Sequence, residues 1–261
     1  MAQIKANEAL VKALQTWNID HLYGIPGDSV DAVVDSLRTV RDQFKFYHVR
    51  HEEVASLAAA SYTKMTGKIG VALSIGGPGI VHLLNGMYDA KMDNVPQLII
   101  AGQTNSTLLG TKFFQETNIS KMVDDVAVYH HQIQKGDNVF EITNEAIRTA
   151  YEKKGVSVII CPNDLLTQKI KDTTNRAVDT TKPKPASPKF KSIKKAAKLI
   201  DKAKKPVMLI GLGTQHAKDE LREFIEAAKI PVIHTLPAKT ILPDDHPYSI
   251  GNLGKIGTKT S

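Results

Sequence analysis

Three short runs dominated by apolar residues constrain the fold of this 261-residue chain more than any other feature. They span residues 69–74, 96–102 and 156–161. Strands this uniformly apolar are typical of a parallel sheet that is covered by helices on both faces. Helical patterns lie between the runs. The sequence therefore predicts an α/β fold, an open, mainly parallel sheet flanked by helices.

The other elements of this first unit follow from the spacing of apolar residues. Helical spacing predicts helices at residues 7–17, 52–66, 80–90 and 144–151, and shorter apolar runs predict strands at 21–24 and 44–49. Residues 103–125 follow no regular pattern. A long irregular segment at the end of a strand is often functional, so this one is a candidate for a site.

A polar segment with three prolines, residues 173–188, predicts a linker of limited flexibility. We therefore expect a first domain at 1–172 and a second unit at 189–261. In the second unit we expect strands at 206–211 and 230–234 and helices at 190–204 and 217–228. Two strands are too few for a stable open sheet, so this unit is expected to be part of a domain.

The first helix of the second unit is strongly basic. Its apolar residues are expected to point inward, and they are Ile193, Ala196, Ala197, Leu199 and Ile200. The formal net charge of the chain is +7, but residues 181–206 alone hold ten lysines and one aspartate. The rest of the chain is therefore slightly acidic. This distribution favours a solvated segment over a nucleic-acid surface, and no nucleic-acid partner is expected.

Cysteine content and the N-terminus bound the class of protein further. Because Cys161 is the only cysteine, an internal disulfide and a cysteine-rich zinc site are excluded. Its place in an apolar run favours a buried structural thiol over a nucleophile. No run of eighteen apolar residues and no apolar signal region is present. A cytoplasmic protein is the expectation.

Two features of the first unit have a functional and a structural interpretation. Glu52 begins a predicted helix, where a solvated charge that favours the helix dipole is common, although Glu53 can fill that role. Residues 76–79, Gly-Gly-Pro-Gly, suit either a phosphate cradle or a tight strand-to-helix turn. No Gly-Lys-Ser/Thr follows, which excludes a P-loop. In the second unit, Gly211 and Gly213 follow a strand, but the third glycine of a dinucleotide motif is missing.

Six motifs taken together resemble one enzyme family. They are Gly24-Ile25-Pro26-Gly27-Asp28, Arg50-His51-Glu52-Glu53, Thr66-Gly67-Lys68-Ile69-Gly70-Val71, Gly77-Pro78-Gly79 with Asn85-Gly86, Asn94-Val95-Pro96 and Phe114-Gln115-Glu116. Their order and spacing over most of residues 4–165 resemble the thiamine-diphosphate enzymes of the pyruvate oxidase and acetolactate synthase group. The bacterial pyruvate oxidases, including those that reduce quinone, are the most similar.

The resemblance implies a pyrimidine-binding N-terminal domain and assigns roles within it. Glu52 would hydrogen-bond N1′ of the cofactor's aminopyrimidine, and Phe114 and Gln115 would cover the reacting carbon. The pyrimidine site would be shaped by Pro26, Gly27, Gly77, Pro78, Gly79 and Asn85. The second unit would be part of the central FAD-binding domain, with contacts from Gly211, Gly213, Thr235 and Lys239. Thiamine diphosphate, FAD and Mg²⁺ are the implied cofactors.

One departure from the family affects the expected activity. The Gly-Asp-Gly motif and later Asn that bind diphosphate and magnesium do not occur here. We therefore expect an N-terminal fragment without metal ligands, inactive by itself. When full length, it would oxidise pyruvate to acetate or acetyl phosphate as a dimer of dimers. Quinone and the inner face of the membrane would be reached through the missing part. The alternatives are an acetolactate synthase-type carboligase and a non-catalytic nucleotide-binding or assembly module.

Overall fold

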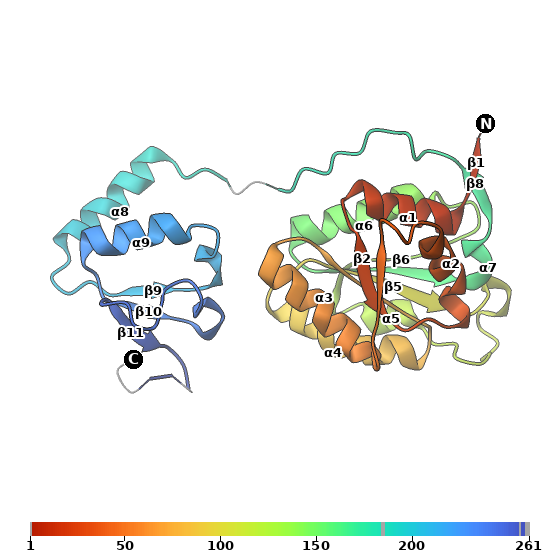
Figure 1. Ribbon diagram of the computed structural model, residues 1–261, viewed down its shortest axis with the longest axis horizontal. Coiled ribbons are helices and arrows are strands. Elements are labelled where there is room, and N and C mark those ends of the chain that lie inside the picture. The colour runs from red at the N-terminus through yellow and green to blue at the C-terminus, as the bar shows by residue number, and fades with distance from the viewer. Residues whose placement is uncertain (1, 184–185, 256, 259–261) are drawn as a thin grey trace. The chain divides into compact units, whose positions relative to one another are not determined.

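The computed structural model describes residues 2–183, 186–255 and 257–258. The chain divides into two compact units, Met1–Lys184 and Pro185–Ser261, and each is considered by itself (Figure 1). Within the described residues no helix is long and apolar enough to cross a bilayer.

The first unit is built on a six-stranded sheet in the order β3-β2-β4-β5-β7-β6. The strands are β2 (His21–Gly24), β3 (Lys45–His48), β4 (Gly70–Ser74), β5 (Gln97–Gln103), β6 (Ala127–Gln132) and β7 (Val156–Pro162). All neighbouring strands are parallel. The three central strands β4, β5 and β7 are buried along their whole length, as their apolar sequences predict. The predicted α/β fold is confirmed.

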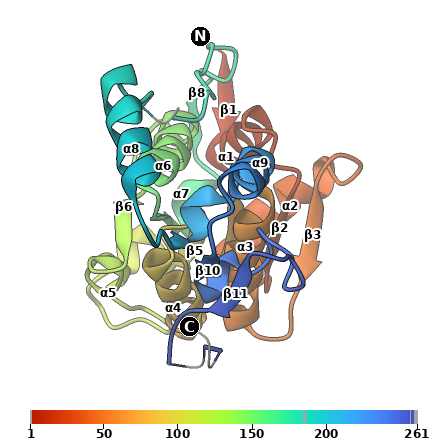
Figure 2. The same ribbon diagram turned by 90° about the vertical axis from the view of Figure 1, so that its left-hand side faces the viewer.

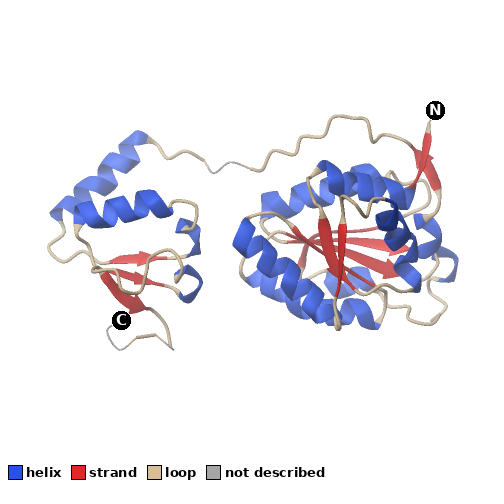
Figure 3. Ribbon diagram, viewed as in Figure 1, coloured by secondary structure: helices blue, strands red, loops and turns tan. Residues whose placement is uncertain are grey.

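Helices cover both faces of this sheet (Figure 3). Successive residues of a strand point to opposite faces. Leu98 and Ile100 of β5 therefore join the core under α1 (Ala6–Thr16), α2 (Asp31–Thr39), α6 (Val139–Lys153) and α7 (Asn163–Leu166). Ile99 and Ala101 join the core under α3 (Glu52–Thr66), α4 (Pro78–Met92) and α5 (Ile119–Val123).

Helices α3 and α4 lie side by side because small residues face each other. A Cβ added to Gly86 of α4 would lie 2.5 Å from the backbone nitrogen of Leu57 in α3. Helix α3 ends at Gly67, whose φ of 68° is the left-handed conformation that glycine favours at a helix C-terminus. Both helices begin at the edge of the sheet where strands β3 and β4 end.

Several elements of the first unit do not follow from its apolar pattern. The edge strand β6 is half-buried throughout, and β1 (Gln3–Lys5) pairs antiparallel with β8 (Lys169–Lys171). Helix α6 starts at Val139, five residues before the predicted start, because the Asn138 side chain caps it by accepting from the Glu141 backbone N–H. Two short 3₁₀ turns, η1 (Asp28–Val30) and η2 (Ser106–Leu108), lie in loops.

The second unit contains a parallel sheet in the order β11-β10-β9 (Figure 1), of which β10 and β11 are also labelled in Figure 2. Its elements are α8 (Phe190–Lys202), β9 (Met208–Ile210), η3 (Leu212–Thr214), α9 (Lys218–Ala228), β10 (Val232–His234), η4 (Leu236–Ala238) and β11 (Ser249–Asn252). The expectation of two strands was wrong, because a third strand, β11, forms after them in the chain.

The inward orientation predicted for the apolar side of α8 is also wrong. Every residue of α8 is exposed, including Leu199 at 64% and Ile193 at 50%. The core of this unit forms instead between the sheet, α9 and residues 238–242, and it includes Ile225 and Val232. Helix α8 lies outside that core, so its apolar side is left uncovered in the described residues.

Candidate functional site

The loops that follow β2, β4 and β5 touch one another at the carboxyl edge of the sheet. The Ser29 hydroxyl oxygen accepts a hydrogen bond of 3.2 Å from the Gly76 backbone N–H. A Cβ on Gly102, at the end of β5, would lie 2.3 Å from the same oxygen. In open parallel sheets ligands bind outside this edge, so these contacts place the candidate site.

The glycine loop before α4 packs against a distant part of the chain. Gly77 is the N-cap of α4 and has a φ of 59°. A Cβ at Gly77 would lie 2.9 Å from the backbone oxygen of Gln115, which itself has a φ of 62°. The loop 76–79 and Gln115, both expected to belong to one site, are therefore in direct contact.

Glu52 is the first residue of α3, and its side chain is only 13% exposed. Its Oε2 lies 2.9 Å from Nδ1 of His82, which belongs to the second turn of α4. The neighbouring carboxylate of Glu53 accepts from the Asn85 side-chain amide. The starts of α3 and α4 are thus joined by two polar contacts, and Oε1 of Glu52 makes no hydrogen bond within the described residues.

Two histidines surround the Glu52 carboxylate. The rings of His51 and His82 lie 4.4 Å apart between centroids, inclined by 31°. One potential ligand atom from each of His51, Glu52 and His82 lies within 4.8 Å of the others. This nitrogen and oxygen donor set is unlike the all-oxygen sites that Mg²⁺ prefers. The magnesium implied by the resemblance does not fit here.

Residues 103–118 form a folded loop held by side-chain contacts to its backbone. The Gln103 amide donates to the Thr117 oxygen at 2.8 Å. The Glu116 carboxylate accepts from the backbone N–H groups of Gly110 at 2.5 Å and Phe113 at 3.1 Å. The hydrogen bond from Gly110 and that from Phe113 hold the pKa of Glu116 below its usual value. This loop carries Gln115 to the glycine loop.

The remaining candidates of the first unit lie after β2, at the start of α4 and in the segment between η2 and α5, and they differ in exposure. Gly27 follows β2, and a Cβ there would lie 2.6 Å from the Ile75 side chain. Gly79 is equally close-packed, with a Cβ contact of 2.9 Å to Ile75. Pro26 is exposed, and so is the Phe114 side chain at 77%.

The sequence analysis named His51 within a motif but assigned no role at the site to His51, His82 or Ser29. The spacing of His82 and Asn85, three residues apart, was an available signal, because it places both on one face of α4. Nothing in the sequence alone indicated that this face meets the start of α3.

The second unit brings its candidate residues to one edge as well. Gly211 and Thr235 follow the adjacent parallel strands β9 and β10, and a Cβ on Gly211 would lie 3.9 Å from the Thr235 hydroxyl. A Cβ on Gly213 would meet nothing within 4 Å in the described residues. Lys239 forms an ion pair of 3.3 Å with Asp244. Two loops at adjacent strand ends suit a nucleotide-type ligand, so this edge fits part of an FAD site.

Comparison with known proteins identifies the family. The N-terminal TPP-binding domain of thiamine pyrophosphate enzymes matches residues 4–122, and the central domain of the same enzymes matches residues 193–261. The two matches together cover well over half of the chain. The chain belongs to the family of thiamine pyrophosphate-dependent enzymes.

Individual relatives agree with this assignment. YdaP of Bacillus subtilis, described as thiamine pyrophosphate-containing, is 48% identical over 99% of this chain and 45% of its own length. A pyruvate oxidase of Lactiplantibacillus plantarum is 38% identical over 98% of this chain and 43% of its own. An acetolactate synthase of Mycobacterium leprae is 34% identical over 98% of this chain and 41% of its own length. The chain thus spans less than half the length of these relatives.

Proposed function

We propose that this chain supplies the pyrimidine-binding domain and part of the FAD-binding domain of a pyruvate oxidase. That enzyme would decarboxylate pyruvate with thiamine diphosphate and pass the electrons to FAD. The observation that carries the proposal is the Glu52 carboxylate. It is largely buried at the start of α3, with one oxygen held by His82 and no hydrogen bond within the described residues on the other.

The first unit fits an aminopyrimidine in two respects. The free Oε1 of Glu52 can hydrogen-bond N1′ of the ring, and burial strengthens that interaction. The contact between Gly77 and Gln115 leaves no room for a side chain, so the loop offers bare backbone to a ligand. Bound thiamine diphosphate supplies an electron sink for the departing carboxylate of a 2-keto acid.

The residues of this chain would then act as positioning and proton-handling groups. Glu52 would hold a proton between its carboxylate and N1′, which favours the ring tautomer that acts as a base. Pro26, Gly27, Pro78, Gly79 and Asn85 would shape the pocket around the ring. Phe114 and Gln115 would exclude water from the reacting carbon, and the exposure of Phe114 leaves its ring available for that role.

In the second unit, the loops at the ends of β9 and β10 would contact FAD. Gly213 has open space beside it, and Gly211 lies close to Thr235. A ligand could therefore approach the backbone of both loops closely. Lys239 would add a positive charge at the same edge. The magnesium ligands would come from residues outside this chain, as the resemblance implies, because the cluster of His51, Glu52 and His82 offers two nitrogen donors.

An acetolactate synthase is the second candidate. The 34% identity to the Mycobacterium leprae enzyme supports it as directly as the 38% identity to the Lactiplantibacillus plantarum enzyme supports the oxidase. A non-catalytic nucleotide-binding or assembly module is the third. For each of the two enzymes we propose a homo-oligomer, a dimer of dimers for the oxidase. A quinone acceptor at a membrane surface and a cytoplasmic location are further proposals for the complete protein.

The test compares the complete protein with its Glu52→Gln variant, each supplied with thiamine diphosphate, magnesium and FAD. Pyruvate-dependent flavin reduction that is slowed at least a hundredfold in the variant would support an oxidase with Glu52 as cofactor activator. Undiminished reduction in the variant would remove Glu52 from the mechanism. Acetolactate formation without flavin reduction would assign the synthase instead. Binding of FAD without any turnover would favour the assembly module.

A further inference from the structure

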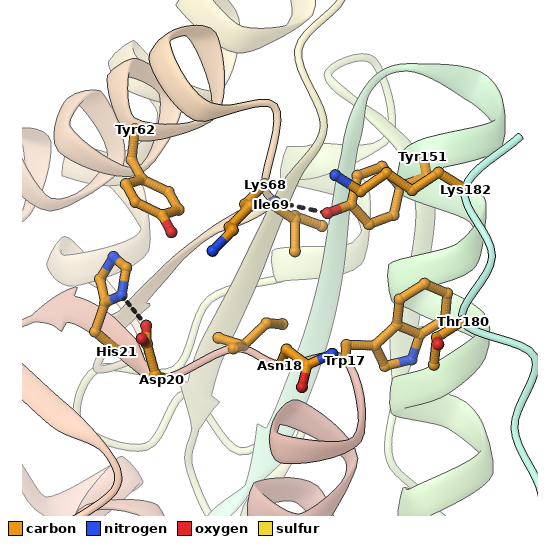
Figure 4. A pocket seen from close by; sticks show the side chains of 11 residues that line it. Trp17, Asn18, Asp20, His21, Tyr62, Lys68, Ile69, Tyr151, Thr180 and Lys182 are labelled. Carbon is orange, nitrogen blue, oxygen red and sulfur yellow. Dashed lines mark hydrogen bonds and ion pairs between the residues drawn. The ribbon is translucent and has the colours of Figure 1, made fainter. Parts of the chain in front are cut away.

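A cavity of about 160 Å³ lies at the amino ends of β2 and β4, the edge of the sheet opposite the candidate site (Figure 4). Several parts of the first unit meet around it, namely the end of α1 with the start of β2, the second half of α3, the turn before β4, Tyr151 of α6 and the segment 180–182. The proposed function uses none of the residues that line it.

Aromatic contacts hold the walls of this cavity in place. The Trp17 ring stacks on Tyr151 at 5.9 Å, and its indole N–H donates to the Asn144 side-chain oxygen at 2.8 Å. The Tyr151 hydroxyl oxygen accepts from the Ile69 backbone N–H at 2.8 Å. The wall is therefore formed before any ligand arrives, which lowers the cost of ordering on binding.

The lining carries several hydrogen-bond donors, exposed in Lys68 and Asn18 and half-buried in Tyr62 and Thr180. The Lys68 ammonium, the Tyr62 hydroxyl, the Asn18 amide and the Thr180 hydroxyl line the cavity, and none makes a side-chain hydrogen bond within the described residues. Figure 4 shows the Lys68 side chain extending toward the space between Tyr62 and Asp20. An ammonium and three neutral donors suit a ligand that accepts hydrogen bonds.

The single carboxylate in the lining is already engaged. Oδ1 of Asp20 lies 2.6 Å from Nδ1 of His21, and this hydrogen bond, with the nearby Lys68, lowers the pKa of Asp20. Two ammonium groups, Lys68 and Lys182, therefore line the cavity against one carboxylate. Counted without the histidine, Lys68, Lys182 and Asp20 carry a formal net charge of +1.

Lys182 contributes a fixed positive charge. Its ammonium donates to the Gly67 carbonyl at 2.6 Å and lies 5.1 Å from the centre of the Tyr151 ring. Burial lowers the pKa of Lys182, and repulsion from Lys68 lowers it further. A negative charge bound in the cavity would favour the protonated form of Lys182 and so offset both effects.

We propose that this cavity is a binding site for a small, singly charged oxyanion, a carboxylate or dihydrogen phosphate, held by Lys68 and the hydroxyl and amide donors around it. The volume of about 160 Å³ is too small for a nucleotide, because pockets for larger ligands enclose roughly 300 Å³ or more. The excess of one positive charge matches one negative charge on the ligand.

The chain contains a single tryptophan, Trp17, which lines this cavity, so tryptophan fluorescence can follow ligand binding there. The experiment titrates the chain separately with acetate and with phosphate, below the second pKa of phosphate, with chloride keeping the ionic strength constant. The indole N–H and the Ile69 amide are followed by NMR in the same titrations, because fluorescence can be insensitive to a bound anion.

We expect saturable changes in the fluorescence or the NMR signals with at least one of the two anions. The anion that binds more tightly shows whether the site takes a carboxylate or a phosphate. Lys68→Gln should weaken its binding at least tenfold, whereas Lys68→Arg, which keeps the charge, should stay within about threefold of the wild type. Lys171→Gln, an exposed lysine of β8 outside the cavity, and Glu52→Gln at the opposite edge should leave binding unchanged. Absence of saturable binding by both methods, or binding that persists in a folded Lys68→Gln, would overturn the proposal.

Discussion

Nδ1 of His82 lies 2.9 Å from Oε2 of Glu52 and joins α4 to the first residue of α3. This contact fixes the orientation of the carboxylate and leaves its other oxygen free. We predict that His82→Phe, which keeps a ring beside His51 but removes the hydrogen bond, lowers pyruvate turnover of the complete enzyme about tenfold, roughly 1.4 kcal/mol. The loss should appear in kcat more than in KM, because His82 does not contact the substrate in the proposed site.

The matched control for this prediction is Lys91→Gln. Lys91 lies in the last turn of the same helix and forms an ion pair of 2.8 Å with Asp125, far along α4 from its start. Its removal should change turnover less than twofold. Equal losses in the two variants would mean that helix stability, and not the orientation of Glu52, determines the rate.

Gly77 should not tolerate a side chain. Its φ of 59° disfavours any other residue, and a Cβ would lie 2.9 Å from the backbone oxygen of Gln115. We expect Gly77→Ala to reduce the free energy of unfolding of the first unit by about 2–3 kcal/mol. Urea denaturation followed by Trp17 fluorescence measures this, since the only tryptophan belongs to that unit.

Gly110→Ala separates the backbone effect from the steric effect. Gly110 also has a positive φ, 85°, but a Cβ there would meet nothing within 4 Å in the described residues. Only the conformational cost of about 1 kcal/mol should appear. If both variants lose the same free energy, the close approach of Gln115 contributes nothing to stability.

The fold of the first unit could be predicted because its strands and helices carry strong local patterns. The apolar runs of β4, β5 and β7 are buried as expected, and helix α3 begins at Glu52 and ends at Thr66 as its spacing predicts. Strand β6 was missed because its two faces are both half-buried, so polar residues such as His130 and His131 interrupt the apolar pattern.

The candidate site was only partly predictable for a physical reason. Motifs identify residues that follow a strand or begin a helix, and Glu52 and Gly77 were found in that way. The contact of Glu52 with His82 depends on how close α3 and α4 approach, and Gly86 sets that distance. The predicted orientation of α8 was wrong for a different reason. An apolar stripe indicates which side of a helix favours burial, but not which element covers that side.

Lys64 links α3 to the C-terminal part of α4 through carboxylates at 2.7 Å (Asp89) and 2.6 Å (Asp93). Burial alone lowers the pKa of Lys64, but the hydrogen bonds to Asp89 and Asp93 outweigh it, so the pKa is raised overall above 10.5. A group whose pKa is raised on folding stabilises the protein below its unfolded pKa, and that contribution is lost as pH rises through the folded pKa. Lys64→Met should therefore cost about 1–2 kcal/mol at neutral pH.

The pH dependence distinguishes this ion pair from simple packing. The difference in unfolding free energy between the wild type and Lys64→Met should stay constant from pH 7 to about 10 and decrease above about 10.5. Urea titrations across that range, followed by Trp17, provide the measurement. A difference that persists undiminished at the highest pH would assign the effect to packing of the lysine stem.

Cys161 should be inert in the native chain. It is fully buried in β7, and burial raises the pKa of its thiol to about 12. Only the thiolate reacts with alkylating reagents, and at pH 8 about one thiol in ten thousand would be ionised. We expect no alkylation by iodoacetamide in the native state and complete alkylation in urea, measured by mass spectrometry. Native-state labelling at the unfolded rate would contradict the buried structural role.

The second unit offers a direct comparison of two apolar helical residues. Ile225 of α9 is fully buried, whereas Leu199 of α8 is 64% exposed. Ile225→Ala leaves a cavity in the core and should destabilise this unit by about 2–4 kcal/mol, while Leu199→Ala should change its stability by less than about 0.5 kcal/mol. Hydrogen exchange of the β10 amides reports on this unit separately from the first. Comparable destabilisation by both variants would mean that in solution the apolar side of α8 is packed against another surface.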